Sequence, residues 1–150
     1  PRTPNIITSL ELDPAEMEKR NIHLQKKYAE IEENEVRFEE LHCEDSEYLI
    51  VAFGSCARIA QKAMEMAREE GIKVGLLRPI TLWPFPSKAI AARAAQVKGI
   101  LTVELNAGQM VEDVRLAVEC KVPVEHFGRL GGIVPDPDEV ITALKEKLIK

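Results

Sequence analysis

Residues 48–80, YLIVAFGSCARIAQKAMEMAREEGIKVGLLRPI, decide the fold class of this 150-residue chain. The run from Tyr48 to Ser55 is continuously apolar, which is typical of a strand covered on both faces. An amphipathic stretch follows and stops at Gly71, and a second apolar strand runs over residues 72–80. A strand, a helix and a strand in this order predict two parallel strands joined by a right-handed crossover.

The same alternation extends in both directions along the chain. Asp13 is a good helix cap with Pro14 at the first helical position, so an exposed helix is expected over residues 14–35. The next segment alternates apolar and charged residues, as in a half-exposed edge strand. The other predicted elements are an edge strand 36–42, a helix 87–97 capped by Ser87, a strand 99–105, a helix 110–120, a weak strand 123–129 and a closing helix 136–149 capped by Asp136. The prediction is an α/β fold with a largely parallel sheet between helix layers.

Composition and charge exclude several classes of function. The net charge is −5 and the pI is about 5.3, with charges of both signs interspersed, so no basic stripe is available to follow nucleic-acid phosphates. No apolar run approaches the roughly 20 residues that cross a bilayer. Cys43, Cys56 and Cys120 have neither disulfide nor metal-clip spacing, which favours the cytoplasm. The chain begins at Pro1 on an irregular stretch, and we expect it to be a piece of a longer polypeptide.

The stretch FGSCAR, residues 53–58, is the first candidate site, because a helix begins there at the end of a central strand. Backbone N–H groups at such a helix start can hold a phosphate, and Cys56 could have a lowered pKa. The sequence contains no G-x-G-x-x-G, P-loop or G-x-S-x-G spacing at this position. Close packing of small residues between helix and strand is the favoured interpretation, and anion binding is the alternative.

The stretch VELNAGQMVEDVR, residues 103–115, is the second candidate. It places an unusually polar set beside a buried strand, namely Glu104, Asn106, Gln109 and Arg115. A binding or interface role is one interpretation. The other is structural: Asn106 and Gly108 suit a tight turn, and Glu112 and Asp113 favourably meet the helix dipole.

The stretch RPITLWPFP, residues 78–86, holds three of the nine prolines and the only tryptophan. Pro84 and Pro86 flank Phe85 and forbid both a continued sheet ladder and a helix interior, so a stiff, extended connector is expected. Trp83 and Phe85 held in this way would make anchors for a partner. The alternative is a loop folded over the core of its own domain.

Two further features have bland interpretations. Gly128, Gly131 and Gly132 lie within FGRLGGIVP, residues 127–135, where a turn before the last helix is favoured over a ligand cradle. The histidines are scattered without zinc-ligand spacing, and we expect ordinary surface or half-buried positions for them and no metal site: His23, His42 and His126.

Three motifs together resemble one family. YLIVAFGSCARIAQKAMEMAREEGIKVGLLRPITLWPFP, VELNAGQMVEDVRLAV and HFGRLGGIVPDPDEVI are similar to the C-terminal part of the alpha subunit of 2-oxoacid:ferredoxin oxidoreductases. The resemblance implies a transketolase C-terminal-like domain at residues 35–150, preceded at residues 1–34 by a linker and helix from an absent domain. It implies a three-layer α/β/α sandwich around a five-stranded, mostly parallel mixed sheet in which Arg37 to His42 form one antiparallel edge strand.

The resemblance also implies a division of labour. In that family the complex decarboxylates a 2-oxo acid on thiamine diphosphate, transfers electrons through [4Fe-4S] clusters to ferredoxin and transfers the acyl group to coenzyme A. The implied partners are a thiamine-diphosphate- and Mg²⁺-binding beta subunit, a gamma subunit and a ferredoxin-like delta subunit. This chain is expected to bind none of these cofactors, to supply no catalytic residue and to be inactive alone.

Within the family, the motifs are most similar to the branched-chain type, which acts on 3-methyl-2-oxobutanoate (ketoisovalerate), with the 2-oxoglutarate type as the close alternative. Two alternatives lie outside this role. One is a stand-alone coenzyme A or nucleotide-binding module, and the other is a regulatory module that dimerises through its proline loop. By resemblance to transketolase-type enzymes, the loop Asn106 to Met110 and the following helix face a neighbouring subunit or domain. The expected interface residues are Trp83, Phe85, Asn106, Gly108, Gln109, Met110, Asp113 and Arg115.

Overall fold

The structure, a computed structural model, describes residues 3–5 and 10–149. The chain divides into two units, Pro1–Glu35 and Val36–Lys150. The first unit contains helix α1 (Pro14–Asn34). The side chain of Asp13 accepts hydrogen bonds from the backbone N–H groups of Ala15 and Glu16, which confirms the predicted cap. No described residue of α1 is buried, so the helix is exposed along its length, as its many charges predict.

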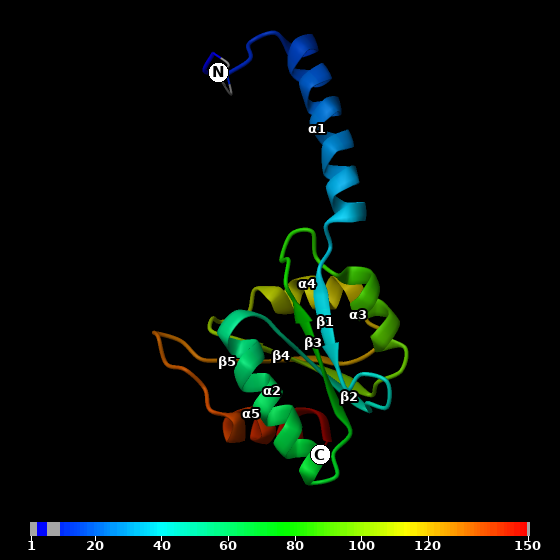
Figure 1. The fold of residues 1–150 in the computed structure, drawn as a ribbon, viewed down its shortest axis with the longest axis vertical. Coiled ribbons are helices and arrows are strands. Elements are labelled where there is room, and N and C mark those ends of the chain that lie inside the picture. Colours follow the sequence, from blue (N-terminus) through cyan, green and yellow to red (C-terminus); the bar gives the residue numbers. More distant parts are fainter. Residues whose placement is uncertain (1–2, 6–9, 150) are drawn as a thin grey trace. The chain divides into compact units, whose positions relative to one another are not determined.

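The second unit is built on a five-stranded sheet with the order β1-β3-β2-β4-β5 (Figure 1). The edge strand β1 runs antiparallel to β3, and the other neighbouring pairs are parallel. This arrangement confirms the predicted mixed sheet with one antiparallel edge. The strand bounds are β1 (Phe38–Leu41), β2 (Tyr48–Ala52), β3 (Val74–Pro79), β4 (Gly99–Glu104) and β5 (Val124–Gly128).

Helices cover both faces of the sheet and make three layers (Figure 1). Alternate residues of the central strand face opposite ways: Ile50 packs with α2 and α5, whereas Leu49 packs with α3 and α4. Residues 48–52 are therefore apolar without interruption because both faces of β2 are covered. The helix bounds are α2 (Gly54–Glu69), α3 (Ser87–Ala94), α4 (Met110–Val118) and α5 (Pro137–Leu144), followed by a π-helical turn, η1 (Lys145–Ile149).

The helix ends confirm two of the sequence signals and correct one. Asp136 and Glu139 form a capping box at the start of α5, and Gly71 has a positive φ of 87° just after α2. Ser87, however, is not the cap of α3. It is already the first helical residue, the cap position belongs to Pro86, and no side chain caps this helix.

The proline segment is bent and packed rather than extended, which corrects the expectation of an extended connector. Its Trp83–Pro84 peptide bond is cis, and the backbone bends at residue 80 and again at residues 82–84. The hydroxyl of Thr81 donates to the carbonyl of Pro84 at 2.8 Å and accepts from the N–H of Arg37 at 3.0 Å. The first bond closes a turn within the segment, and the second joins the segment to the residue just before β1.

Candidate functional site

The carboxyl ends of the four parallel strands β3, β2, β4 and β5 lie on the same side of the sheet, which we call the carboxyl edge. In open α/β folds, functional groups gather at these strand ends. Glu104 ends β4 at this edge and is fully buried. Its Oε2 accepts hydrogen bonds from the N–H groups of Gln109 at 3.2 Å and Met110 at 2.9 Å, and its Oε1 accepts from Val111 at 3.1 Å. The carboxylate therefore caps α4 from the neighbouring strand.

A buried carboxylate is costly unless charge-assisted hydrogen bonds and a favourable dipole compensate for its lost hydration. The first turn of α4 supplies both, since its N–H groups have no intrahelical partners and carry the positive end of the helix dipole. Gln109, at the N-cap position, makes no side-chain capping bond, so Glu104 takes that role. The interpretation of Glu104 as part of a binding set is therefore corrected: it holds the loop from inside.

His126 on β5 lies beside this carboxylate, a contact that its isolated place in the sequence did not indicate. Its Nδ1 is 3.4 Å from Oε1 of Glu104 and 3.2 Å from Oγ1 of Thr102. The hydroxyl of Thr102 donates to the carbonyl of Glu125 at 3.3 Å, so the shared proton of the pair belongs on Nδ1 of His126. The half-buried imidazole thus donates towards Glu104 and Thr102 and covers the carboxylate.

The loop between β4 and α4 is held against the end of β5. Asn106 accepts through Oδ1 from the N–H of Gly108 at 2.7 Å, and Gly108 has a φ of 111°, which confirms the predicted tight turn. A Cβ at Gly128 would lie 2.2 Å from the carbonyl oxygen of Asn106 and 2.6 Å from Nε2 of His126. Gly128 is therefore required by the close approach of two segments.

The structure places the eight expected interface residues in different environments. Trp83, Gln109, Asp113 and Arg115 are exposed, Phe85, Asn106 and Gly108 are half-buried, and Met110 is buried. Phe85 and Met110 pack with the core beneath α3 and α4, so their side chains serve their own domain.

The exposed members of this set do not form one cluster. Arg115 donates to the carbonyl of Val124 at the start of β5, so its guanidinium points towards the opposite edge of the sheet. Trp83 and Gln109 belong to loops at the carboxyl edge, but β2 lies between the two strands that these loops follow. The proline loop and the Asn106–Gln109 loop therefore lie at different places along the carboxyl edge and do not form one surface patch.

Cys56 has the opposite character from a reactive thiol. Burial raises its pKa, and the negative charge of Glu104 raises it further. The expectation of a lowered pKa is therefore wrong, because the apolar packing around the thiol outweighs the positive end of the helix. Ala57 and Ala60 continue the same buried face of α2, which confirms the close packing of small residues against the sheet.

The three cysteines are free thiols in three places. Cys43 is buried on the α3 and α4 side of the sheet, Cys56 is buried on the other side, and Cys120 is exposed. They do not fit the four-thiolate set that holds an iron–sulfur cluster. Within residues 3–5 and 10–149, no three histidine, cysteine or acidic side chains are grouped as metal ligands. None of the helices in these ranges combines the length and hydropathy needed to cross a bilayer.

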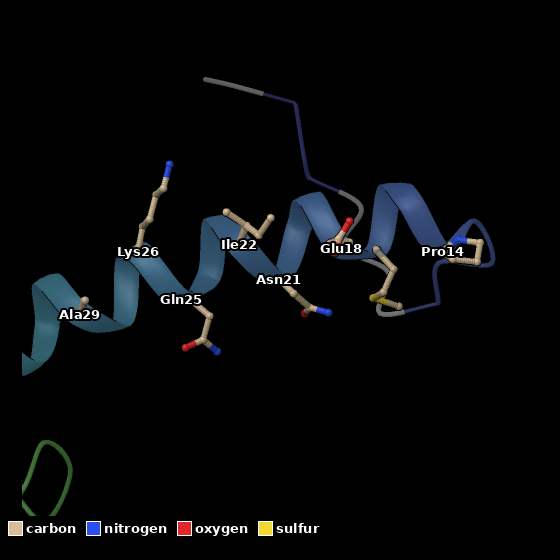
Figure 2. Close-up of a pocket in the computed structure, with 8 residues that line it drawn as sticks. Pro14, Glu18, Asn21, Ile22, Gln25, Lys26 and Ala29 are labelled. Carbon is tan, nitrogen blue, oxygen red and sulfur yellow. The ribbon is translucent and has the colours of Figure 1, made fainter.

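A hollow of about 700 Å³ lies along α1, and its described lining residues all come from this helix. Figure 2 shows the side chains of Glu18, Asn21, Gln25 and Lys26 spaced along the helix instead of converging on one point. All four are exposed, so none has the burial that perturbs a catalytic side chain. We therefore place the candidate site at the carboxyl edge of the sheet.

The layers and the strand order form an α/β domain with a transketolase-like fold. A chain titled "Split gene transketolase, inactive beta4 tetramer" matches 75% of this chain and 41% of its own length, with a TM-score of 0.64 and 21% identity. The chain belongs to the family described as pyruvate:ferredoxin oxidoreductase core domain II, whose model matches residues 46–140. The fold and the family assigned from sequence are thereby confirmed.

Relatives with assigned names agree with this family. The chain is 46% identical to a ketoisovalerate oxidoreductase subunit, VorB, of Methanothermobacter marburgensis over 95% of this chain and 40% of the relative. It is 32% identical to a 2-oxoglutarate synthase subunit, KorA, of the same organism over 67% of this chain and 27% of the relative. Among solved structures, a 2-oxoglutarate:ferredoxin oxidoreductase of Magnetococcus marinus with 2-oxoglutarate, coenzyme A and succinyl-CoA bound matches with a TM-score of 0.77 and 25% identity. That match covers 91% of this chain and 24% of the other. The chain thus spans less than half the length of these relatives.

Proposed function

We propose that this chain is the C-terminal assembly domain of a thiamine-diphosphate-dependent 2-oxoacid:ferredoxin oxidoreductase. The parent enzyme oxidatively decarboxylates a branched-chain 2-oxo acid, 3-methyl-2-oxobutanoate, to the acyl-coenzyme A and reduces ferredoxin. The domain itself contributes packing and subunit contacts, and it is inactive alone. The observation that carries the choice of substrate is the 46% identity to a ketoisovalerate oxidoreductase subunit across 95% of the chain.

The side chains at the carboxyl edge favour a structural, non-catalytic role for this domain. The oxygens of the buried Glu104 carboxylate already accept hydrogen bonds from backbone N–H groups and contact His126. The carboxylate is therefore not free to accept a proton from a substrate. Cys56 is a protonated, buried thiol and not an activated nucleophile. The groups at this edge that are available to another molecule are exposed side chains on loops and on the outer face of α4.

The cofactors of the proposed enzyme belong to the rest of the complex. Thiamine diphosphate and Mg²⁺ are assigned to a beta subunit, the [4Fe-4S] clusters to a ferredoxin-like delta subunit, and a gamma subunit completes the assembly in the cytoplasm. The scattered thiols of this chain are consistent with that division, because they do not assemble a cluster site. In this assembly, the exposed part of the predicted interface consists of Trp83, Gln109, Asp113 and Arg115, and Asn106 is half-buried beside Gln109.

A 2-oxoglutarate-specific parent enzyme is the second candidate, because a solved 2-oxoglutarate:ferredoxin oxidoreductase matches 91% of this chain with a TM-score of 0.77. It is ranked lower because the identity of that match is 25%. Both candidates give this domain the same role. They differ in the acyl substrate, which the remainder of the parent enzyme selects.

The test is reconstitution. The full-length subunit is purified with its partner subunits and assayed with thiamine diphosphate, Mg²⁺, coenzyme A and a viologen acceptor, with 3-methyl-2-oxobutanoate or 2-oxoglutarate as substrate. We expect turnover of the branched substrate by the complex and none by residues 1–150 alone. Preference for 2-oxoglutarate would favour the second candidate, and turnover by the isolated chain would contradict the supporting role.

The interface is tested separately. Gln109→Ala together with Asp113→Ala removes two exposed polar side chains at the start of α4, and we expect weaker association of the full-length subunit with its partners. Both side chains are exposed, so the fold should be kept, with a loss no larger than that of one exposed charge at a helix start. Unaltered subunit association in sedimentation velocity would contradict an interface at this helix start.

A further inference from the structure

The segment between β5 and α5, residues 129–136, projects from the second unit as an arm, seen in orange in Figure 1. Both ends of the arm are fixed. The N–H of Arg129 donates to the carbonyl of Glu104 at 3.2 Å, and its guanidinium donates to Oε1 of Glu139 at 2.8 Å. Pro135 is buried, and Asp136 is the cap of α5. One end of the arm is therefore held by a hydrogen bond to the backbone of Glu104, and the other end leads directly into the capped helix α5.

The tip of the arm is apolar and exposed. Leu130, Ile133 and Val134 retain 58%, 52% and 61% of their accessible surface. The N–H of Ile133 donates to the carbonyl of Leu130 at 3.3 Å across Gly131 and Gly132, both of which have positive φ. Three large aliphatic side chains on a turn of this kind are a surface that another molecule can cover, because burying them releases apolar area from water.

The charge around the tip selects the kind of partner. Arg129 is paired with Glu139, so its positive charge is compensated. Asp136 and Asp138 are exposed, and neither carboxylate makes an ion pair within the part of the chain that the structure describes. The base of the arm therefore presents two exposed carboxylates without a cationic partner among the described residues, next to an apolar tip.

A second copy of this chain is a poor occupant. If the arms of two copies paired tip to tip about a two-fold axis, each tip would meet the same tip of the other copy. The aspartates of both copies would then converge, and like charges facing each other across an interface weaken it. A different protein surface, with an apolar groove flanked by lysine or arginine, complements both the tip and the rim.

We propose that the arm docks in an apolar groove with a basic rim on another subunit of the complex. This inference rests on the assembly role proposed above and names the contact that the sequence did not indicate. The tip supplies the area buried, and Asp136 and Asp138 face the basic rim. Because the turn and both ends are already fixed, little conformational entropy is lost on docking.

The first experiment removes the apolar tip in the full-length subunit, co-purified with its partner subunits. Leu130→Ser with Ile133→Ser is compared with Leu12→Ser with Ile22→Ser, which changes a leucine and an isoleucine of the first unit that are 83% and 51% exposed. We expect the arm variant to raise the dissociation constant of the subunits at least about tenfold and the control to change it less than about twofold. Equal effects of the two variants would overturn the proposal.

The second experiment tests the rim. Asp138→Asn removes one of these exposed charges without touching the capping box of Asp136 and Glu139. We expect weaker association at low ionic strength and a smaller dependence of the dissociation constant on salt, since a rim charge acts through screened attraction. An unchanged salt dependence would overturn the basic rim.

The third experiment identifies the occupant. A photo-crosslinking residue replaces Ile133 in the assembled complex, and we expect a covalent product with a different subunit, at a peptide that combines apolar and basic residues. Crosslinking to another copy of this chain, or no product with another subunit, would overturn the proposal. Normal assembly of the arm variant with failure of the Gln109 and Asp113 variant would reject the arm alone, and normal assembly of both would reject the assembly role as well.

Discussion

Nδ1 of His126 lies 3.4 Å from Oε1 of Glu104, so a side chain of the edge strand β5 covers the carboxylate that ends β4. Thr102, not Glu104, is the registered partner of His126 across the two strands. The imidazole of His126 therefore contacts its registered partner Thr102 and also Glu104, two residues further along β4. The carboxylate is enclosed between this ring and the first turn of α4.

Glu104→Gln is predicted to lower the free energy of unfolding of the chain by about 2–3 kcal/mol, because hydrogen bonds to a charged acceptor are lost and an NH₂ group replaces one of the two acceptor oxygens. Glu104→Ala should cost more, since it leaves buried N–H groups without a partner. Urea denaturation followed by far-UV circular dichroism measures both changes.

The matched control for this prediction is Glu112→Gln, in the first turn of the same helix but exposed. It should cost no more than about 0.5–1 kcal/mol, the size of an exposed charge interacting with a helix dipole. If the two substitutions cost the same, Glu104 is not the cap of α4.

Gly128→Ala is predicted to destabilise the chain by about 1–3 kcal/mol, because the new Cβ would lie 2.2 Å from the backbone oxygen of Asn106. The comparison is Gly99→Ala, whose Cβ would meet the terminal methyl of Leu148 at 2.7 Å. A flexible side chain can move aside and a hydrogen-bonded loop cannot, so Gly99→Ala should cost less. Thermal unfolding of the two variants decides the order, and the reverse order would contradict the tight approach of the two loops.

The two aromatic residues of the proline loop are predicted to respond differently to truncation. Phe85→Ala should lower the free energy of unfolding by about 2–3 kcal/mol, because the ring packs with the core beneath α3 and α4. Trp83→Ala should cost about 1 kcal/mol or less, since 55% of the residue is exposed. Chemical denaturation of both variants measures this. A greater loss from Trp83→Ala would place the tryptophan in the core and remove it from the proposed interface.

The three thiols are predicted to react at different rates with iodoacetamide at pH 8. Burial raises the pKa of Cys43 to about 11 and also raises that of Cys56, so both remain protonated and enclosed, whereas Cys120 is exposed. Mass spectrometry of the folded chain should find Cys120 alkylated at least about tenfold faster than the others. Fast labelling of Cys56 would restore the idea of a reactive thiol at the start of α2.

The same pKa predicts a loss of stability in alkali. The folded pKa of Cys43 is raised above the unfolded value of 9.0, so its contribution to stability is complete below pH 9 and declines as the pH rises towards 11. The free energy of unfolding of Cys43→Ala should fall less steeply between pH 9 and pH 11 than that of the original chain. Parallel slopes would contradict the raised pKa.

Much of the fold could be predicted from the sequence because its signals are local. Continuous apolar runs located the buried strands, and Asp13, Gly71 and Asp136 marked helix ends through their own side chains or backbone. A serine before an alanine-rich helix can be the N-cap residue or the first helical residue, and composition does not distinguish the two. The sequence predicts Ser87 as the cap, whereas it is the first residue of α3. The bends of the proline segment depend on the distant Arg37, which no local pattern includes.

The candidate site was harder to predict because it is made by contacts between distant residues. Glu104 looked like part of a polar binding set, and only the packing of β4 against α4 reveals that its oxygens are occupied. His126 looked isolated because its partner is on another strand. One signal was available: a glutamate at the end of an apolar strand and six residues before the first residue of a helix can serve as that helix's cap.

The way in which Glu104 holds the β4–α4 loop separates the shape of that loop from its chemical identity. The carboxylate binds backbone N–H groups, which every amino acid except proline provides. Side chains on the solvent side of the loop can therefore be exchanged during evolution without changing its path. A family that must fit one scaffold to different neighbours gains from such an arrangement, because recognition can diverge while the backbone that presents it stays in place.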